Sequence, residues 1–504
     1  MRIKQTWVLI LCIAVIAAGV LGCGSEQERE TKVVIAQGVD ARTMDPHMHA
    51  ETTTTNVLIH IFDRLFTRDE DMELIPHLAE EAKVMDDLIW EITLKEGIYF
   101  HNGESFNADS VKFSIDRIIK PGSKSPVVSS LNTIDQVEVI DDVTVRIITK
   151  VPDPILPNRL TLMMVPKEYI LKHGDEYFAE HPVGTGPYEL ASWTRDEEVV
   201  LQANEEYWLG PPAIETVVFR SIPENSVRIA ELQTGSVDLI VNVPPHQIGS
   251  VEETGHSRVV STPSGRRIYV QLVADQGGKI ADPKVRQALN YAVDVPELIE
   301  TILDGHGYAS TQPLTPLDFG YHPEAEGFSY DPKRAQELLT EAGYPEGISI
   351  QLDTCSGRYV MDREVAEALI GQMAEAGIEA ELTVNEWGVH IEKLLEKQME
   401  HAFLIGVGTV LFDADAALFS HLRSEERLSY YSNEELDGLL DQARQEMDLE
   451  ARENFYHQAI EVILEDPPFI FLHQQEDIYG VHEDLQWQPT ADELIYAYHM
   501  SFNR

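Results

Sequence analysis

The sequence is poor in basic residues. Among its 504 residues there are 38 Lys and Arg against 86 Asp and Glu, which gives a formal net charge of −48 at pH 7. Removing residues 1–22 takes away Arg2 and Lys4 and no acid, so 86 acidic and 36 basic residues remain, a formal charge of −50. Such a charge repels nucleic acids and anionic lipids, so we expect neither as a partner. A hydrophobic content of 43% excludes a fully disordered chain.

Motifs of the common catalytic sites are missing as well. The chain contains no His-Glu-x-x-His, no Gly-x-Ser-x-Gly and no Cys-x-x-Cys. Asp413-Ala414-Asp415 has the composition of a metal-binding or acid/base pair, but alternate residues of a strand or loop more often face opposite ways. We therefore predict that the protein is not an enzyme, and we expect no cofactor.

Cysteine is rare, with three residues in the whole chain, and the first two belong to an N-terminal export signal. Arg2 and Lys4 precede an uncharged apolar run from Trp7 to Leu21. This run is shorter than the roughly 20 residues of a membrane span. Val20-Leu21-Gly22-Cys23 follows and resembles a bacterial lipobox, so we predict a signal peptide at 1–22 and lipidation of Cys23. The alternatives are an ordinary signal peptide or an anchor helix.

Residues 23–31 are polar after Cys23 and are predicted to form a flexible tether. Cys12 lies in the leader and Cys23 takes the lipid, which leaves Cys355 as the remaining cysteine. We therefore expect no intrachain disulfide in the mature domain.

Residues 74–118 contain a pattern of strand, turn and helix. Apolar and polar residues alternate from Leu88 to Leu94, as they do in a half-buried strand. Asn107 is a predicted N-cap, because Ser110 to Ile118 carries apolar residues at helical spacing. The amino-acid sequence of this segment resembles the signature of the family 5 extracellular solute-binding proteins. These are the receptors of ABC importers for peptides, nickel and related solutes.

Other segments of the chain are similar to the same family. Asp45-Pro46-His47 followed by a helix resembles its beginning, Gly184 to Tyr188 reads Gly-Thr-Gly-Pro-Tyr, and residues 285–294 read VRQALNYAVD. A nucleotide-binding loop is the other interpretation of residues 181–188, but no Gly-Lys-Ser/Thr follows them. The resemblance extends from about residue 32 to residue 500.

The resemblance implies an α/β, two-lobe periplasmic-binding-protein-like fold of type II, with a hinge and an additional small domain. We predict lobe I at 32–66, 184–272 and 487–504, the small domain at 67–183, and lobe II at 273–486. Local signals in lobe II support an α/β arrangement. Asp282 and Asp331 each precede a proline as predicted helix caps, Asp362 is a third predicted cap, and Ser432 with Glu435 forms a predicted capping box.

The function implied is that of a substrate-binding lipoprotein of an ABC importer, which captures a peptide or similar small solute between closing lobes. The expected partners are this solute, the permease subunits, and the membrane through the lipid anchor, with the protein itself a monomer. It is expected outside the cytoplasm, exported by a Sec-type signal and anchored on the periplasmic or outer face of the cell membrane. The alternatives are a nickel- or metal-chelate receptor, and a signalling receptor of the same fold without transport.

The predicted ligand-binding residues come from segments spread over the chain. They are His49, Glu51, Thr52, Arg266, Tyr269, Arg358, Tyr359, Trp387 and Asp413. Arg358 lies in a loop, 353–363, between a predicted strand and helix, where strand ends line the ligand crevice of α/β sheets. Relatives place an arginine near this position to hold a ligand carboxylate, which arginine binds with two parallel hydrogen bonds. The alternative is a surface ion pair of Arg358 with Asp353.

Two features of the sequence leave the identity of the ligand open. In peptide-binding relatives an aspartate after the glycine-rich strand binds the peptide amine, and the matching position in residues 403–418 is Val410. Asp413 or Glu51 would have to take that role. His47 and His49 suit nickel, copper or zinc, but a pair without a third ligand is a weak signal, so we predict no metal site and expect these side chains to form hydrogen bonds.

Overall fold

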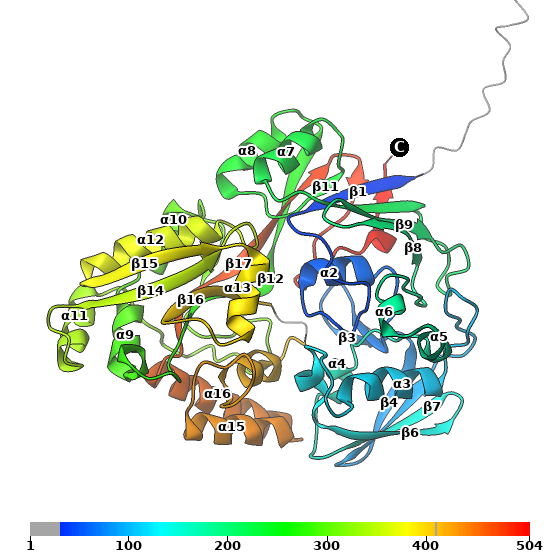
Figure 1. Cartoon of the computed structure of the whole chain (residues 1–504), viewed down its shortest axis with the longest axis horizontal. Coiled ribbons are helices and arrows are strands. Elements are labelled where there is room, and N and C mark those ends of the chain that lie inside the picture. Colours follow the sequence, from blue (N-terminus) through cyan, green and yellow to red (C-terminus); the bar gives the residue numbers. More distant parts are fainter. Residues whose placement is uncertain (1–30, 409–410, 504) are drawn as a thin grey trace, which may run out of the picture.

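The computed structural model describes residues 31–408 and 411–503. Cys23, the lipobox and Val410 lie outside the described residues. Two lobes and a smaller domain lie around a common centre, and long strands connect the lobes (Figure 1). None of the helices in the described part of the chain is both long and apolar enough to cross a membrane.

One mixed sheet runs through both lobes. Within the described residues it has eleven strands, in the order β15-β14-β16-β12-β17-β11-β1-β10-β9-β8, with β13 paired to β17. Their bounds are β1 (Lys32–Gln37), β8 (Tyr188–Thr194), β9 (Glu198–Ala203), β10 (Thr216–Ser221), β11 (Leu239–Ile240), β12 (Ser257–Leu272), β13 (Tyr308–Ala309), β14 (Ile348–Cys355), β15 (Ile378–Asn385), β16 (Ala402–Val407) and β17 (Phe469–His482).

Lobe I is built on β1 and β8–β11. β1 pairs in parallel with β10 and β11, and β8, β9 and β10 are antiparallel. Its core contains Val33 and Ile35 of β1 with Val217 and Phe219 of β10, all fully or almost fully buried. The helices of this lobe are α2 (Thr52–Leu58), α7 (Asn225–Gln233) and α8 (Ile248–Glu252), and η2 (Pro245–Gln247) is a short 3-10 turn. The C-terminal β18 (Leu485–Gln486), η5 (Ala497–His499) and β19 (Ser501–Phe502) pack here as well.

The small domain has its own antiparallel sheet and core. In the described residues the sheet has four strands, in the order β4-β5-β7-β6, and a hairpin of β2 and β3 lies beside it. The bounds are β2 (Phe66–Arg68), β3 (Leu74–Pro76), β4 (Ala79–Asp86), β5 (Ile89–Leu94), β6 (Ile134–Asp141), β7 (Thr144–Thr149), α3 (Ala108–Ile119), η1 (Val128–Leu131), α4 (Leu156–Arg159), α5 (Lys167–His173) and α6 (Asp175–Phe178). The predicted strand at 88–94 and the predicted cap at Asn107, which accepts the Ser110 N–H, are both confirmed.

The chain returns from the small domain to lobe I along a narrow path. Gly186 N–H donates to the Ile61 carbonyl at 2.9 Å, and Tyr188 N–H donates to the His60 carbonyl at 2.8 Å. A Cβ at Gly184 would lie 1.9 Å from the Ile61 carbonyl oxygen, so no other residue fits there.

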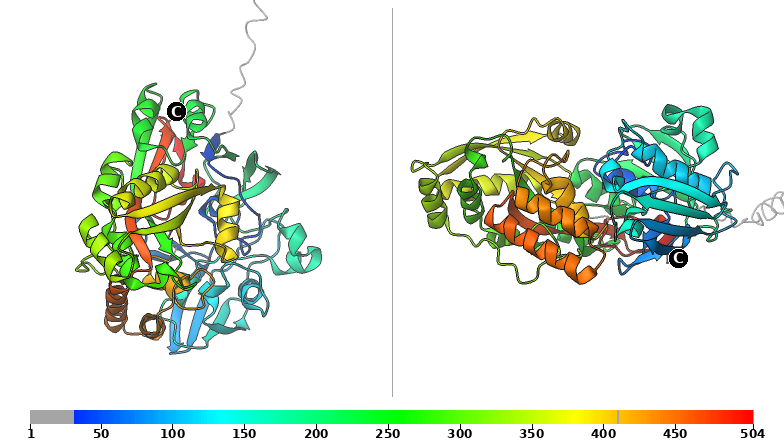
Figure 2. Two further views of the ribbon diagram at one scale, coloured as in Figure 1. Left: turned by 60° about the vertical axis from the view of Figure 1, so that its left-hand side comes forward. Right: turned by 90° about the horizontal axis from the view of Figure 1, so that it is seen from below.

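Lobe II contains the parallel strands β14, β15 and β16, with helices packed around them (Figure 2). The helices are η3 (Lys279–Ala281), α9 (Pro283–Tyr291), α10 (Val295–Thr301), α11 (Pro332–Glu341), α12 (Asp362–Glu375), α13 (Trp387–Leu395), η4 (Asp415–Phe419), α14 (Ser420–Leu422), α15 (Glu434–Gln445) and α16 (Leu449–Glu465). Asp282 and Asp331 cap α9 and α11 as predicted. The cap of α15 is Asn433, so the predicted capping box at Ser432 is wrong by one residue.

β12 and β17 connect the two lobes as an antiparallel pair. The N-terminal half of β12 pairs with the C-terminal half of β17 beside β11, and their other halves pair beside β16 and lie in the core of lobe II. The pair therefore belongs to both lobes, and the domain boundaries inferred from the sequence stay predictions.

Candidate ligand-binding site

Strand pairing is irregular where β12 and β17 pass from one lobe to the other. Regular pairing stops at Pro263 and resumes at Arg267. Between them the Ser264 hydroxyl donates to the Gln475 carbonyl at 3.0 Å and accepts the Arg266 N–H at 3.1 Å. Bulges of this kind change the direction of a side chain. Here the affected side chain is that of Arg266.

The buried guanidinium of Arg266 contacts both lobes. Nη1 donates to the Gly406 carbonyl of β16 in lobe II at 2.9 Å. Nη2 donates to Thr52 Oγ1 at the start of α2 at 3.1 Å and to Glu493 Oε2 at 2.7 Å, both in lobe I. The guanidinium also lies over the ring of Tyr359, 5.5 Å from its centroid. Arg266 is therefore a direct link between the lobes.

The loop that carries Arg358 connects β14 to α12, as predicted, and a buried carboxylate holds its backbone. Asp362 accepts the N–H groups of Gly357, Arg358, Tyr359 and Arg363 at 2.9–3.1 Å. Asp362 is the first residue of α12, and Met361, with a φ of 55°, occupies the cap position. The predicted cap at Asp362 is thus wrong, because its side chain binds the preceding loop.

The side chain of Arg358 is buried and has no acidic partner. It is 9% exposed and lies near two rings, 5.1 Å from the centroid of Tyr359 and 5.5 Å from that of Trp387. Within the described residues no carboxylate lies within 4 Å of it and Nε forms no hydrogen bond. Burial, followed by the charge of Arg266, lowers the pKa of Arg358. Asp353 pairs with Lys393 instead, so the predicted alternative of an Arg358–Asp353 pair is wrong.

Two acidic side chains accompany the arginines. Glu493 binds Arg266 and adopts a φ of 64°, a left-handed backbone that a residue other than glycine rarely takes. Asp477 of β17 accepts from Gln475 Nε2 at 2.5 Å and from the Tyr479 hydroxyl at 3.3 Å. Burial, followed by the charge of Glu493, raises the pKa of Asp477 to about 8. At neutral pH Asp477 is therefore mostly uncharged. The guanidinium groups of Arg266 and Arg358 are then accompanied by one paired carboxylate, that of Glu493 on Arg266.

The structure brings most of the predicted site residues to this place. Thr52, Arg266, Arg358, Tyr359 and Trp387 are linked by the contacts above, and the Trp387 and Tyr359 rings meet edge to face at 5.9 Å. The Tyr359 hydroxyl donates to the same Gly406 carbonyl as Arg266.

The other predicted residues have different surroundings. Tyr269 is packed against Phe469 in the core of lobe II, with 4.0 Å between ring centroids. His49 is buried, 3.8 Å from Glu51, and Glu51 pairs with Arg42 at 3.0 Å just before Thr52. Asp413 is buried, and its two oxygens accept hydrogen bonds from both terminal nitrogens of Arg452, at 2.6 and 2.8 Å.

Four residues of this group were not predicted from the sequence. They are Glu493, Asp477, Gln475 and Gly408, which lies beside Arg266 and Glu493. Glu493 comes from the C-terminal segment and Asp477 from β17, far along the chain from the motifs that indicated a site. No local pattern marks either acid, because each is placed by the pairing of β12 with β17 and by the return of the chain to lobe I.

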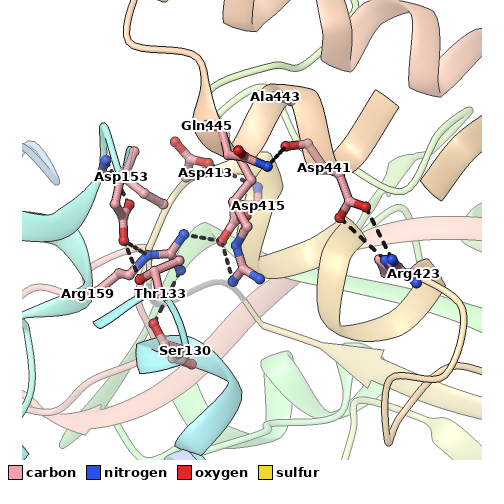
Figure 3. A network of polar contacts seen from close by, with 12 residues as sticks. Ser130, Thr133, Asp153, Arg159, Asp413, Asp415, Arg423, Asp441, Ala443 and Gln445 are labelled. Carbon is pink, nitrogen blue, oxygen red and sulfur yellow. Dashed lines mark hydrogen bonds and ion pairs between the residues drawn. The ribbon is translucent and has the colours of Figure 1, made fainter. Parts of the chain in front are cut away.

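A second set of contacts joins the small domain to lobe II (Figure 3). Arg159 of α4 binds Asp153 at 2.8 Å within its own domain and Asp415 of η4 at 2.7 Å across the boundary. Asp415 in turn pairs with Arg444 of lobe II at 3.0 Å. All four side chains are buried. Each charge of the inter-domain pair has a second partner on its own side, so separation of the domains leaves neither charge unpaired.

The two histidines differ in their hydrogen bonds: His49 Nδ1 is buried without a partner, contrary to expectation, whereas His47 is engaged at both ring nitrogens. His47 Nε2 lies 2.9 Å from the Met163 carbonyl, and Arg117 donates to its Nδ1 at 3.2 Å, so both ring nitrogens are occupied. In residues 31–408 and 411–503 no three His, Cys, Asp or Glu side chains form a group that could hold a metal ion.

Comparison with known proteins identifies the family. The family model described as "Bacterial extracellular solute-binding proteins, family 5 Middle" matches residues 73–427. The chain belongs to this family. The resemblance seen in the sequence is thereby confirmed, and the family binds solutes rather than catalysing reactions.

Individual relatives agree with the family match over nearly the whole chain. The glutathione-binding protein GsiB of Escherichia coli O1:K1 / APEC is 31% identical over 455 residues, which cover 87% of this chain and 88% of GsiB. The structure of DppA from Helicobacter pylori, in complex with the peptide STSA, matches with a TM-score of 0.87 and 24% identity, covering 95% of this chain and all of that one. NikZ from Campylobacter jejuni, in complex with Ni(L-His), matches with a TM-score of 0.86 and 25% identity, covering 94% of this chain and 99% of that one.

These findings confirm the predicted two-lobe α/β fold and the predicted role as the solute-binding protein of an ABC importer. The two-lobe architecture also explains where Arg266 and Arg358 lie. They lie at the strands that join the lobes, where hinge closure in two-lobe receptors surrounds a ligand.

Proposed function

We propose that this family 5 protein binds a small peptide or peptide-like solute with a free carboxylate, which Arg358 holds, and delivers it to the permease of its importer. The observation that carries the proposal is the buried Arg358 guanidinium without an acidic partner. Burying a charge without a partner costs several kcal/mol or more, which a ligand carboxylate would recover. Two parallel hydrogen bonds to a carboxylate are the geometry for which arginine is suited.

The charge of the protein supports an arginine-centred site. A chain with a formal charge of −48 repels anions at long range, so an anionic group binds only where positive charge is concentrated. Arg266 and Arg358 form such a place, because Glu493 pairs with Arg266 alone and no carboxylate of the described residues lies within 4 Å of Arg358.

Glutathione is the first ligand to test. It is a tripeptide with two carboxylates and one ammonium group, and the curated relatives that cover most of this chain are named for it. Peptides of other sequence and a chelate such as nickel–histidine follow, because structural neighbours were solved with them.

The test is to identify what the protein carries and then to measure its binding. We expect native mass spectrometry of the protein from its own host to show a small peptide-like ligand. After its removal, titration calorimetry with glutathione should give saturable one-to-one binding, and blocking the carboxylates as ethyl esters should weaken it about tenfold or more. Binding of a nickel–histidine chelate but of no peptide would favour the alternative receptor. Equal binding of ester and free acid would contradict a role for the carboxylate.

We further propose that the mature protein is a monomer anchored through lipid on Cys23, outside the cytoplasm, and that residues 23–31 tether it to the membrane. The support is the Val20-Leu21-Gly22-Cys23 motif behind a short apolar run. We also retain the predicted division into lobe I, small domain and lobe II as a proposal. The separate cores around β1, β5 and β14 support that division.

Replacing Cys23 by Ser should remove the lipid attachment. Because the thiol is the atom that takes the lipid, we expect Cys23→Ser protein either in the soluble fraction or as an unprocessed precursor. Fractionation with an antibody, together with the mass of the product, measures this. A variant that is processed and membrane-bound like the wild type would show that the anchor lies elsewhere.

A further inference from the structure

We propose that Glu493 binds the ammonium group of the ligand, so that a free amine and a free carboxylate are recognised from opposite lobes. This inference rests on the proposed function, because it assumes a peptide-like ligand. Such a ligand carries a positive charge as well as a negative one, and an ammonium group taken out of water needs an ionised acid as its partner.

Other acidic side chains near the site already bind groups of the protein. Both oxygens of Asp413 bind Arg452, and Glu51 pairs with Arg42 and lies beside His49. Asp477 contacts Gln475 and Tyr479 through its two oxygens. Its raised pKa leaves it mostly uncharged at neutral pH, which makes it a poor partner for a cation.

Glu493 differs from these acids because one of its oxygens is free. Oε2 binds Arg266, whereas Oε1 forms no hydrogen bond or ion pair within 31–408 and 411–503. The side chain is only 10% exposed, but Oε1 itself is accessible, so a group of the ligand can reach this oxygen. The left-handed backbone of Glu493 is a strained conformation of the kind that tends to occur at functional sites.

The free oxygen points to the end of β16. A Cβ built on Gly408 would lie 3.4 Å from Glu493 Oε1 and 3.2 Å from Arg266 Nη2. A side chain at Gly408 would therefore crowd both groups, and glycine avoids this contact. On the lobe II side, the Tyr359 ring lies beside the Arg266 guanidinium and the Tyr359 hydroxyl donates to the Gly406 carbonyl. Arg358 lies over the same Tyr359 ring. A ligand with its carboxylate at Arg358 would thus have its amine directed to a residue of lobe I, and binding would favour the closed arrangement.

The sequence explains why the acid must come from lobe I. Residues 403–411 at the end of β16 read FLIGVGTVL and contain no acid. The C-terminal segment supplies a carboxylate to the same place from the other side. This arrangement predicts selectivity for ligands with an unblocked amine.

The test combines a change in the protein with a change in the ligand. Glutathione and N-acetylglutathione are titrated into wild type, Glu493→Gln and the control Glu231→Gln. Glu231 is another acid of lobe I that is paired with an arginine, Arg220, away from the site. For the wild type, N-acetylation should weaken binding about tenfold or more. Glu493→Gln should bind glutathione more weakly by a similar factor, and N-acetylation should then cost at most about twofold, because the partner of the amine is already gone. Glu231→Gln should behave like the wild type.

Each other outcome has a distinct meaning. If Glu493→Gln and N-acetylation weaken binding independently, so that their factors multiply, Glu493 acts only through Arg266 and the inference is wrong. If the wild type binds both compounds equally, glutathione capture stands and the amine contact is refuted. If the wild type binds neither, both the proposed ligand and the role of Glu493 are refuted. Thermal melts of the unliganded variants, expected within a few degrees of the wild type, exclude loss of folding as the cause.

Discussion

Replacing Arg358 by Met should abolish most ligand binding and leave the unliganded protein at least as stable as the wild type. Removing one partner of a buried charged contact costs about 2–5 kcal/mol, which corresponds to a loss of affinity of roughly 30-fold or more. Methionine keeps an apolar stem beside Tyr359 and Trp387 but lacks the charge. In the unliganded protein that charge has no acidic partner among the described residues, so its removal relieves a desolvation cost.

Calorimetry with glutathione or the co-purified ligand measures the affinity, and thermal unfolding without ligand measures the stability. Arg363→Met is the matched control, because Arg363 lies five residues further along and forms an exposed pair with Glu367 at 2.8 Å. It should change neither quantity appreciably, since exposed pairs contribute about 0–1 kcal/mol. Arg358→Lys should recover only part of the affinity, because lysine lacks the two-pronged geometry. Unchanged binding in Arg358→Met would remove this residue from the site, and a large loss of stability would make its role structural.

Acidification from pH 6.5 to about 4 should destabilise the ligand-free protein strongly. In each of a set of buried histidines burial lowers the pKa from 6.5 to about 4. They are His47, His49, His60, His390, His421 and His473. In this range the unfolded chain binds protons at these positions and the folded chain does not, so the free energy of unfolding falls as pH falls. Each pKa unit is worth about 1.4 kcal/mol per group, and the effects add over several groups.

The hydrogen bonds of His60 show why it stays neutral. Its Nδ1 lies 2.8 Å from the Asn56 carbonyl, to which it donates, and its Nε2 accepts the Ala497 N–H at 2.9 Å. Protonation of Nε2 would break the second bond and place a charge in the core. Asp477 acts in the opposite direction, because its raised pKa favours the folded state as pH falls from about 8 toward 4. Burial also raises the pKa of Asp275, Asp362 and Glu426. The six histidines outnumber these four carboxyl groups, so a net loss of stability remains.

Denaturant unfolding at pH 7.5, 6, 5 and 4.5 tests this expectation, with His60→Gln as the informative variant. His60→Gln should be less stable than the wild type at pH 7.5, and the difference should shrink by about 2–3 kcal/mol at pH 4.5, where the wild type carries the cost of a neutral buried histidine. His256→Gln, at an exposed position, is the matched control. A difference between His60→Gln and the wild type that does not change with pH would show that His60 is not part of the acid-sensitive set.

Prediction from the sequence succeeded where a feature depends on neighbours along the chain. Asn107, Asp282 and Asp331 cap helices because the side chain of a cap reaches N–H groups two or three residues ahead. The prediction of Asp362 as a cap failed because its carboxylate accepts three N–H groups of the preceding loop, besides that of Arg363. That loop positions Arg358, the residue proposed to hold the ligand carboxylate.

The sequence by itself determined the family, the two-lobe α/β fold and the loop that carries Arg358, because these follow from local patterns and from motifs that survive in relatives. Only the tertiary structure decided which charges are free. Whether Arg358, Asp413 and Glu493 have protein partners depends on Asp353, Arg452 and Arg266, which lie at least five and up to 227 residues away along the chain. Whether two charges pair depends on the distance between them in the folded protein. No pattern along the chain encodes this distance. The candidate site is therefore defined by Arg358, which folding leaves without an acidic partner, and by the free oxygen of Glu493. Both appear only when the lobes are assembled.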